Sequence, residues 1–428
     1  MNLYRKRALP ATLLSLLALG TQPTYAESKM HVDTKGGLSV FDINDEDYWF
    51  KVGGRVNFDY ANFNGDAQGG YPSGSNIRRA RLTMKGGVGS HWVYKIDIDH
   101  RTSGGAEFGE VFLAYDGFEQ VWLAIGQVGS PFGLDNWTSS NESLLMENAL
   151  ISQAFTPPRG IGVYAEGTWT DFAWAASVIT PAAGNTQIGD AIPAALGTNA
   201  PAGPARGTPG SDPYGATARL TYSPVHTPAQ VYHLGTSFTF QDLKNRANLF
   251  NFSTAPELRA RSTRILSTLV PSDSVKDYWV WGAEAAWKSG PLLISGEYMI
   301  AHMDRFTNIA PTDARQPGGD LSYKGYYIAA SYVLTGESHD YDFNGGTFGR
   351  VRPLNKQGAV ELVARHSYIN LQDKSFGLGY ERDNTLGVTW WVNDHVRFLA
   401  NYVHARVPVS LNNKNTLHIF GARAQVNW

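Results

Sequence analysis

The sequence has 428 residues, of which 17% are charged and 12% are aromatic, and its formal net charge is -2 at pH 7. Soluble proteins carry roughly 25% charged residues, so this composition argues against an ordinary soluble enzyme. The slightly acidic balance excludes a surface built to bind nucleic acid. Cysteine is absent, which excludes disulfides and thiolate metal sites.

The N-terminus predicts export. Arg5, Lys6 and Arg7 precede an apolar stretch that ends in small and polar residues, which is the pattern of a secretory signal peptide. The apolar stretch is too short to span a bilayer comfortably. We therefore expect cleavage after Ala26, on the way to an outer membrane of the Gram-negative type.

Beyond the signal peptide, the chain repeats short segments in which apolar and polar side chains alternate. In the last segment, Phe420 and Val426 fall on one face, while Arg423 and Gln425 fall on the other, because successive strand residues point to opposite sides. This alternation is typical of membrane strands that face lipid on one side and water on the other. About sixteen such segments occur, over residues 49–60, 77–85, 92–101, 108–116, 121–128, 161–168, 172–180, 215–223, 231–240, 278–287, 292–302, 324–334, 359–370, 385–392, 395–406 and 416–428.

The segments predict an all-β fold, a transmembrane antiparallel β-barrel of about sixteen strands that resembles a porin. Long external links should then alternate with short periplasmic turns, and they do so almost throughout. The link 335–358 is the exception, because it is long where a short turn is due, and it can conceal a further hairpin. The expected organisation is a signal peptide (1–26), a periplasmic lead-in segment (27–48) and the barrel (49–428), with residues 129–160 as its third external loop.

The third loop has a helix signal of its own. Ser139 and Glu142 form a capping-box pattern ahead of an apolar stretch over residues 144–150, which predicts a helical turn beginning there. The loop either narrows the pore from inside or packs over the mouth of the barrel.

An aqueous pore selects solutes by the charges that line it. Basic side chains on inward faces either attract anions or brace acidic neighbours such as Asp97 and Asp99. The histidines lack metal-ligand spacing and no nucleophile motif stands out, so we expect no enzymatic activity, cofactor or metal. The inward basic residues are Arg79, Arg81, Lys85, Lys95, Arg397 and Arg423.

Several short motifs occur in the order and spacing of a known porin family. They are Lys51-Val52-Gly53-Gly54-Arg55, Arg78-Arg79-Ala80, Phe132-Gly133-Leu134 with Thr138-Ser139-Ser140, His233-Leu234-Gly235, Trp281-Gly282-Ala283-Glu284, and Gly325-Tyr326-Tyr327 with Leu334-Thr335-Gly336-Glu337. Through them the chain resembles the phosphate-selective porin O/P family. The resemblance implies a sixteen-stranded barrel, a homotrimer and a third loop folded inward to narrow the pore.

The resemblance also implies a basic pore wall that includes Arg55, Arg78 and Arg79. Adjacent residues of a regular strand face opposite ways, so Arg78 and Arg79 cannot both point inward unless the strand is irregular. In the fifth external loop, Arg259, Arg261 and Arg264 resemble the family's arginine ladder only in part, or they simply face water.

The third loop departs from the family pattern. Asn136 and Asn141 stand where the resemblance implies lysines, and Asn148 stands where it implies an arginine. An uncompensated carboxylate repels an anion in a narrow pore. The acidic residues of the loop are Asp135, Glu142 and Glu147.

The sequence therefore favours an outer-membrane porin that lets small hydrophilic solutes, chiefly anions such as phosphate, diffuse through a water-filled channel. Its partners would be membrane lipid and two further copies of the chain. One alternative is a general or sugar-passing porin without anion selectivity. Another, from a different class, is an outer-membrane hydrolase or adhesin on a plugged barrel.

Overall fold

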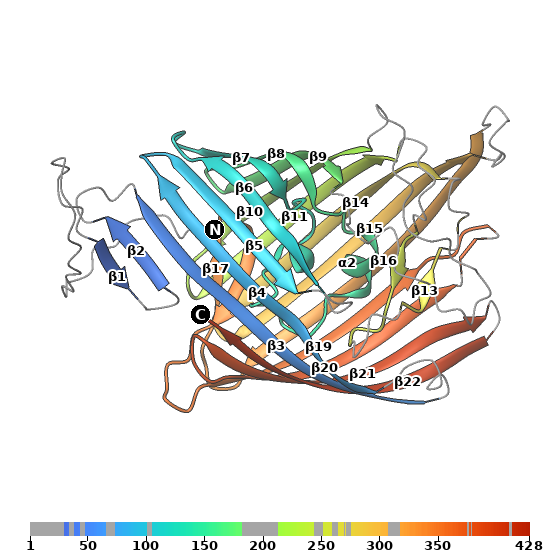
Figure 1. The fold of residues 1–428 in the computed structure, drawn as a ribbon. Helices are drawn as coiled ribbons and strands as arrows, with labels where there is room; N and C mark the ends of the chain where they lie inside the picture. Colours follow the sequence, from blue (N-terminus) through green and yellow to red (C-terminus); the bar gives the residue numbers. More distant parts are fainter. Residues whose placement is uncertain are drawn as a thin grey trace.

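The computed structural model contains a closed antiparallel β-barrel, in which β22 returns to pair with β3 (Figure 1). The structure describes residues 30–33, 38–42, 48–65, 73–100, 105–181, 213–243, 251–258, 264–268, 270, 275–306, 317–374, 376–377, 379–410 and 413–428. The expected signal peptide lies outside the described residues. The barrel strands are β3 (Trp49–Gly65), β4 (Gly74–Val88), β5 (Trp92–His100), β6 (Ala106–Tyr115), β7 (Val121–Val128), β8 (Gly160–Trp169), β9 (Phe172–Pro181), β10 (Tyr214–His226), β11 (Gln230–Asp242), β14 (Val275–Ser289), β15 (Leu292–Phe306), β16 (Pro317–Val333), β19 (Ala359–Asn370), β20 (Tyr380–Trp391), β21 (Val396–Ser410) and β22 (Asn413–Asn427).

The predicted sixteen-stranded barrel is confirmed, and each predicted segment overlaps one of these strands. In β22, Phe420 is 53% exposed on the outside, whereas Arg423 is 2% exposed on the inside. This alternation places an apolar surface toward lipid and polar groups toward the interior. In the described part of the chain, no helix has the length and apolar character needed to cross a membrane.

The barrel closes at the C-terminal residue. The backbone N–H and C=O of Trp428 both bond to Gly54, each at 3.1 Å. A Cβ at Gly54 would lie 2.5 Å from the Trp428 ring and 2.7 Å from the carbonyl of Arg81. The glycine of the Gly53-Gly54 motif therefore makes room for the closing contact.

A small hairpin precedes the barrel. β1 (Met30–Asp33) pairs with β2 (Leu38–Asp42), and β2 pairs with the start of β3. The register runs from Phe41 opposite Trp49 to Leu38 opposite Val52, while β22 ends at Asn427 opposite Arg55. The hairpin thus occupies the part of the β3 edge that β22 leaves unpaired.

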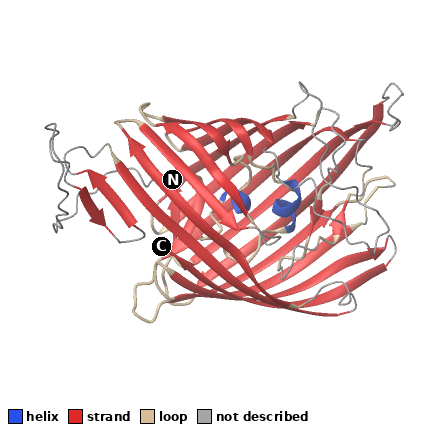
Figure 2. Cartoon of the chain, viewed as in Figure 1, coloured by secondary structure: helices blue, strands red, loops and turns tan. Residues whose placement is uncertain are grey.

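The third loop enters the barrel, as do parts of the link between β11 and β14. The loop contains α1 (Leu134–Trp137) and α2 (Leu150–Phe155), and Figure 2 shows both helices within the barrel outline. Leu150, Ile151 and Phe155 of α2 join an apolar cluster with inward residues of β14, β15, β16 and β19. In the other link, β12 (Ser253–Thr254) and β13 (Leu266–Ser267) form a short ribbon. This core occupies the β14 to β19 side of the interior, whereas a cavity remains along parts of β3, β4 and β5.

The capping box is followed by no helix, since α1 ends before Ser139 and α2 begins at Leu150. Only a single turn forms there, in which the Glu142 N–H donates to the Ser139 carbonyl at 2.7 Å. The Ser139 hydroxyl instead accepts the backbone N–H of Asn141. The carbonyls of residues 140, 143, 146 and 147 accept hydrogen bonds from arginines of the barrel wall. These tertiary bonds replace the i to i+4 bonds that a helix would have needed.

The long link between β16 and β19 contains a hairpin that is separate from the barrel wall. β17 (His339–Asp342) pairs with β18 (Thr347–Val351). The hairpin contacts inward residues of the wall, because Lys288 Nζ donates to the His339 carbonyl at 2.7 Å and the Tyr341 hydroxyl lies 2.6 Å from that of Ser223. The irregular link thus reflects an insertion into the interior from the end that carries the short turns.

Candidate functional site

The barrel interior holds a cavity of roughly 1710 Å³. Its lining combines the inward faces of β3, β4 and β5, the third loop, and the β17–β18 hairpin. Residues of the short turns, including Pro228 and Asp394, also line it, so the cavity extends to the end of the barrel where those turns lie. We take this cavity as the candidate solute pathway.

A basic row follows β3 and β4 along the cavity. Arg55 Nη1 donates to Asn141 Oδ1 at 3.0 Å, and Arg79 Nη1 donates to Ser140 Oγ at 2.8 Å. Within the described ranges, no carboxylate forms an ion pair with any member of the row. Positive charges on adjacent strands repel one another, so the row presents uncompensated positive charge to the cavity. The basic row consists of Lys51, Arg55, Arg79 and Lys85.

Arg78 and Arg79 both face the interior because β4 is irregular there. Asn57 of β3 lies opposite Arg79, whereas the next residue, Phe58, lies opposite Ile77. Arg78 is therefore the extra residue of a β-bulge, which redirects its side chain. Its guanidinium binds both carboxylate oxygens of Glu147, each at 2.8 Å.

Arg81 and Lys95 line the same cavity but are neutralised by neighbours. Arg81 Nη2 lies 2.6 Å from Asp99 Oδ2, and Lys95 Nζ lies 3.1 Å from Asp97 Oδ2. Lys95 also pairs with Glu110. For these two basic residues, the geometry matches the interpretation that they brace acidic neighbours.

Arg397 and Arg423 were expected to line the pore, but both are 2% exposed and they contact the third loop instead. Arg397 donates to the carbonyls of Ser143 and Ser140 at 3.0 and 3.3 Å. Arg423 donates to the Met146 carbonyl at 2.6 Å. A buried guanidinium has several donors in a fixed fork, which suits it to fasten the part of the loop between α1 and α2, where the backbone forms no helix.

The polar residues of the third loop have two roles: some hold the loop in place, and others line the cavity. Asp135 accepts the backbone N–H of Ala149 at 2.9 Å and stays outside the lining. Glu147 lines the cavity but pairs with both Arg78 and Arg423. The remaining members of the predicted set line the cavity, and they are Asn136, Asn141, Glu142 and Asn148.

Glu142 is the loop carboxylate with the weakest ion pairing. Its Oε1 lies 3.9 Å from Arg350 Nε of the β17–β18 hairpin. Burial raises the pKa of Glu142 above its ordinary value, although Arg350 and Arg397 act in the opposite direction. Its carboxylate therefore takes up a proton at higher pH than an exposed glutamate does.

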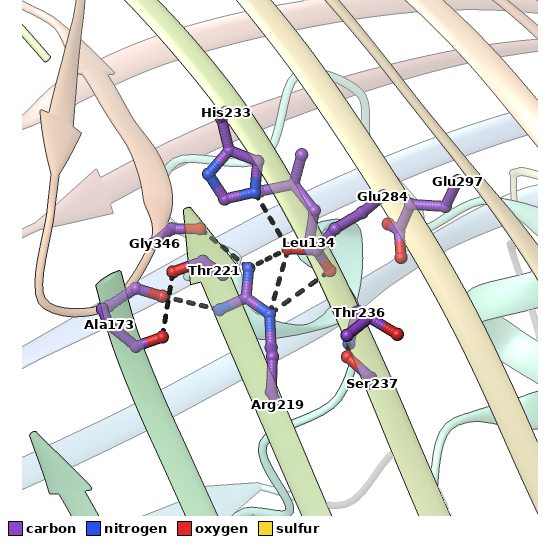
Figure 3. A network of polar contacts seen from close by, with 12 residues as sticks. Leu134, Ala173, Arg219, Thr221, His233, Thr236, Ser237, Glu284, Glu297 and Gly346 are labelled. Atoms are coloured by element: carbon purple, nitrogen blue, oxygen red, sulfur yellow. Dashed lines mark hydrogen bonds and ion pairs between the residues drawn. The ribbon is translucent and has the colours of Figure 1, made fainter. Parts of the chain in front are cut away.

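Sequence reasoning missed the network that anchors the hairpin. Arg219 Nη1 donates to the Gly345 carbonyl at 2.7 Å, and its Nη2 donates to the Gly346 carbonyl at 2.8 Å. The same guanidinium pairs with Glu284, which also lies 2.9 Å from His233 Nε2 (Figure 3). Arg219 falls on the polar face of its predicted strand, but no local pattern links it to a glutamate 65 residues away.

Other candidates lie elsewhere. Arg259 and Arg261 fall outside the described residues, whereas nearby Arg264 lines the cavity and donates to the Ser253 carbonyl at 2.6 Å. In the described segments, no group of three potential ligands is placed to hold a metal ion. Lys51 was overlooked, although it shares the inward face of β3 with Arg55.

Comparisons with known proteins agree with this architecture. The family model described as phosphate-selective porin O and P matches residues 50–428. Porin O of Pseudomonas aeruginosa is 29% identical over 418 residues, covering 89% of this chain and 88% of that protein. An uncharacterized protein of Caulobacter vibrioides is 27% identical over 397 residues, covering 89% of this chain and 74% of that protein.

Two solved structures share the fold at low identity. Salmonella typhi OmpF is 7% identical with a TM-score of 0.52, covering 89% of this chain and 98% of that one. The outer-membrane channel DcaP of Acinetobacter baumannii is 10% identical with a TM-score of 0.51, covering 91% of this chain and 99% of that one. The resemblance found in the short motifs is thus confirmed over most of the chain. The chain belongs to the phosphate-selective porin O and P family and is a β-barrel porin of the outer membrane.

Proposed function

We propose that this porin passes small anions, inorganic phosphate among them, and that the basic row draws them through the channel. The observation that carries the proposal is that Lys51, Arg55, Arg79 and Lys85 line one cavity without a carboxylate partner in the described part of the chain. Like charges gathered on one wall of a narrow passage raise the local concentration of counter-ions.

Selectivity by charge does not require tight binding. Where the family resemblance implies lysines in the third loop, Asn136 and Asn141 line the cavity and offer amides. An amide can hydrogen-bond a phosphate oxygen but supplies no net charge. Phosphate should therefore permeate with weak affinity, and it should block chloride current only at high concentration.

Reversal potentials of single channels in a potassium chloride gradient test the proposal. At about 6 Å and the dielectric constant of water, one positive charge stabilises a monovalent anion by roughly 0.7 kcal/mol, about threefold in occupancy. The same charge destabilises a monovalent cation by an equal amount, so Arg79→Gln should lower the anion-to-cation permeability ratio by roughly tenfold. Arg406→Gln is the matched control, because Arg406 is exposed and outside the cavity lining.

A cation preference in the unmodified channel would contradict the proposal, as would equal ratios in the two variants. Current blocked by an oligosaccharide but unaffected by phosphate would favour the general or sugar-passing porin. We assign the chain no catalytic role, because its family and its fold are those of a channel.

We also propose that the porin assembles as a homotrimer, as the resemblance to the family implies. The test is the protein mass of the detergent-solubilised complex, measured by light scattering during gel filtration. A mass of one chain would contradict this assembly.

A further inference from the structure

We infer that the cavity holds a second subsite, formed by Trp137 and Glu166, that binds the organic part of a phosphate ester while the basic row binds its phosphate. The solute class would be small hydroxylated phosphate esters. The inference rests on the proposed anion channel and specifies its substrate. Both residues line the same cavity as the basic row.

Trp137 presents a fixed aromatic surface to the cavity. It is the last residue of α1, and its ring stacks on Tyr164 of β8 with centroids 6.1 Å apart and planes 19° apart. Trp122 packs edge-on against Tyr164, with ring centroids 5.8 Å apart. Because Trp137 stacks on a tyrosine that is itself held in place, its ring loses little conformational freedom on binding, and its face suits the C–H side of an organic ring.

Glu166 supplies hydrogen-bond acceptors beside that surface. Its Oε2 accepts the Tyr164 hydroxyl at 2.6 Å, so Tyr164 positions both Trp137 and the carboxylate. Across the residues that the structure describes, Glu166 forms no ion pair with a basic side chain. An ionised carboxylate accepts hydrogen bonds but donates none, and it therefore suits a ligand with hydroxyl groups.

In a channel that passed only inorganic anions, a carboxylate at position 166 would hinder their passage. Its charge repels them, and the nearby Glu110 is already paired with Lys95. Glu166 therefore does not serve to neutralise that lysine. Hydroxyl groups that donate to Glu166 would give the carboxylate a function.

The geometry also separates small from elongated solutes. Glu166 lies on β8, four strands from Arg79 on β4, which is about 19 Å along the wall at the usual strand spacing. Side chains from both strands project into the cavity and shorten the gap. A single inorganic phosphate contacts one wall at a time, whereas an elongated ester can engage the row with its phosphate and Glu166 with its hydroxyls.

Chloride current through the full-length channel in planar bilayers tests this inference, with glucose 6-phosphate, inorganic phosphate and glucose as blockers. Glucose 6-phosphate should block at a lower concentration than phosphate, and glucose should not block. Glu166→Gln should raise the half-blocking concentration of glucose 6-phosphate about fivefold, because a neutral acceptor forms weaker hydrogen bonds. The same variant should increase the chloride current, since a repelling charge is lost.

Trp137→Leu should weaken block by glucose 6-phosphate and leave block by phosphate unchanged. Trp137→Phe should retain most of the block by glucose 6-phosphate. Glu119→Gln is the matched control, because Glu119 is an exposed turn residue outside the lining. Equal block by glucose 6-phosphate and phosphate, or equal shifts for both in the Glu166 variant, would overturn the inference and leave the anion channel standing. A cation-selective unmodified channel would instead overturn the proposed function itself.

Discussion

Replacing Arg423 tests whether the barrel wall holds the third loop inside the pore. The guanidinium donates to both carboxylate oxygens of Asp59 at 2.7 Å, to Glu147 at 3.2 Å and to the Met146 carbonyl at 2.6 Å. Arg423→Ala removes all four bonds in one step. Glu147 keeps its bidentate contact with Arg78, so the main loss falls on Asp59 and on the loop backbone.

The magnitude follows from the burial of the pair. Removing one partner of a buried ion pair costs about 3–5 kcal/mol, because the other charge remains without compensation. We expect the lower end, about 3 kcal/mol, since Glu147 retains a partner. Adding Asp59→Asn to Arg423→Ala should recover part of the loss, because the second substitution removes the stranded charge.

Two measurements check this expectation. Urea unfolding from detergent micelles, followed by tryptophan fluorescence, gives the free energy of unfolding, and single-channel recording gives the conductance, which should become larger and noisier as the loop loses an anchor. Arg406→Ala is the control and should change stability by less than about 0.5 kcal/mol, as exposed substitutions do. If the Arg423 variant matches this control in both stability and conductance, the loop is held by other contacts.

Two further outcomes follow from the closing strand and from the loop carboxylate. Gly54→Leu should prevent stable closure of the barrel, because even its Cβ would lie 2.7 Å from the Arg81 carbonyl. The folded fraction on a gel run without heating measures closure. Gly74→Leu is the control, because the Cβ there would meet open space. The anion-to-cation permeability ratio should rise as pH falls below 7, because the raised pKa of Glu142 lets this residue lose its negative charge at higher pH than an ordinary glutamate does. In Glu142→Gln, the permeability ratio should change less with pH than in the unmodified channel. If the two channels show the same pH dependence, Glu142 has no such role.

The strands could be predicted because their cause is local. Along β22, an outward Phe420 and an inward Arg423 reflect a period of two that the pleated backbone imposes. Lipid on one side and water on the other make that pattern visible in each strand separately. The inward direction of Arg81 and Lys95 could be read in the same way, whereas that of Arg55 was implied by the family resemblance.

The irregular positions were hidden because their causes are not local. Arg78 faces inward only because β4 gains a residue relative to β3 at that point. The capping box at Ser139 failed because arginines on other strands take the carbonyls that a helix would have used. Such partners are hundreds of residues away in the chain, and the sequence gives no sign of their distance in space.

The amino-acid sequence by itself determined the compartment, the barrel, the number of its strands and, at regular strand positions, the face on which a charged side chain lies. Those properties follow from hydrophobicity and from the two-residue period of a strand. Only the tertiary structure decided which basic side chains are paired and which face the cavity without a carboxylate partner among the described residues. Arg397 and Arg423 donate their hydrogen bonds to the third loop, and Arg423 also pairs with Asp59. Arg55 and Arg79 instead keep an uncompensated charge in the cavity. The difference depends on which loop and which carboxylate come within a few ångströms, and that is settled by how the chain folds back into its own barrel.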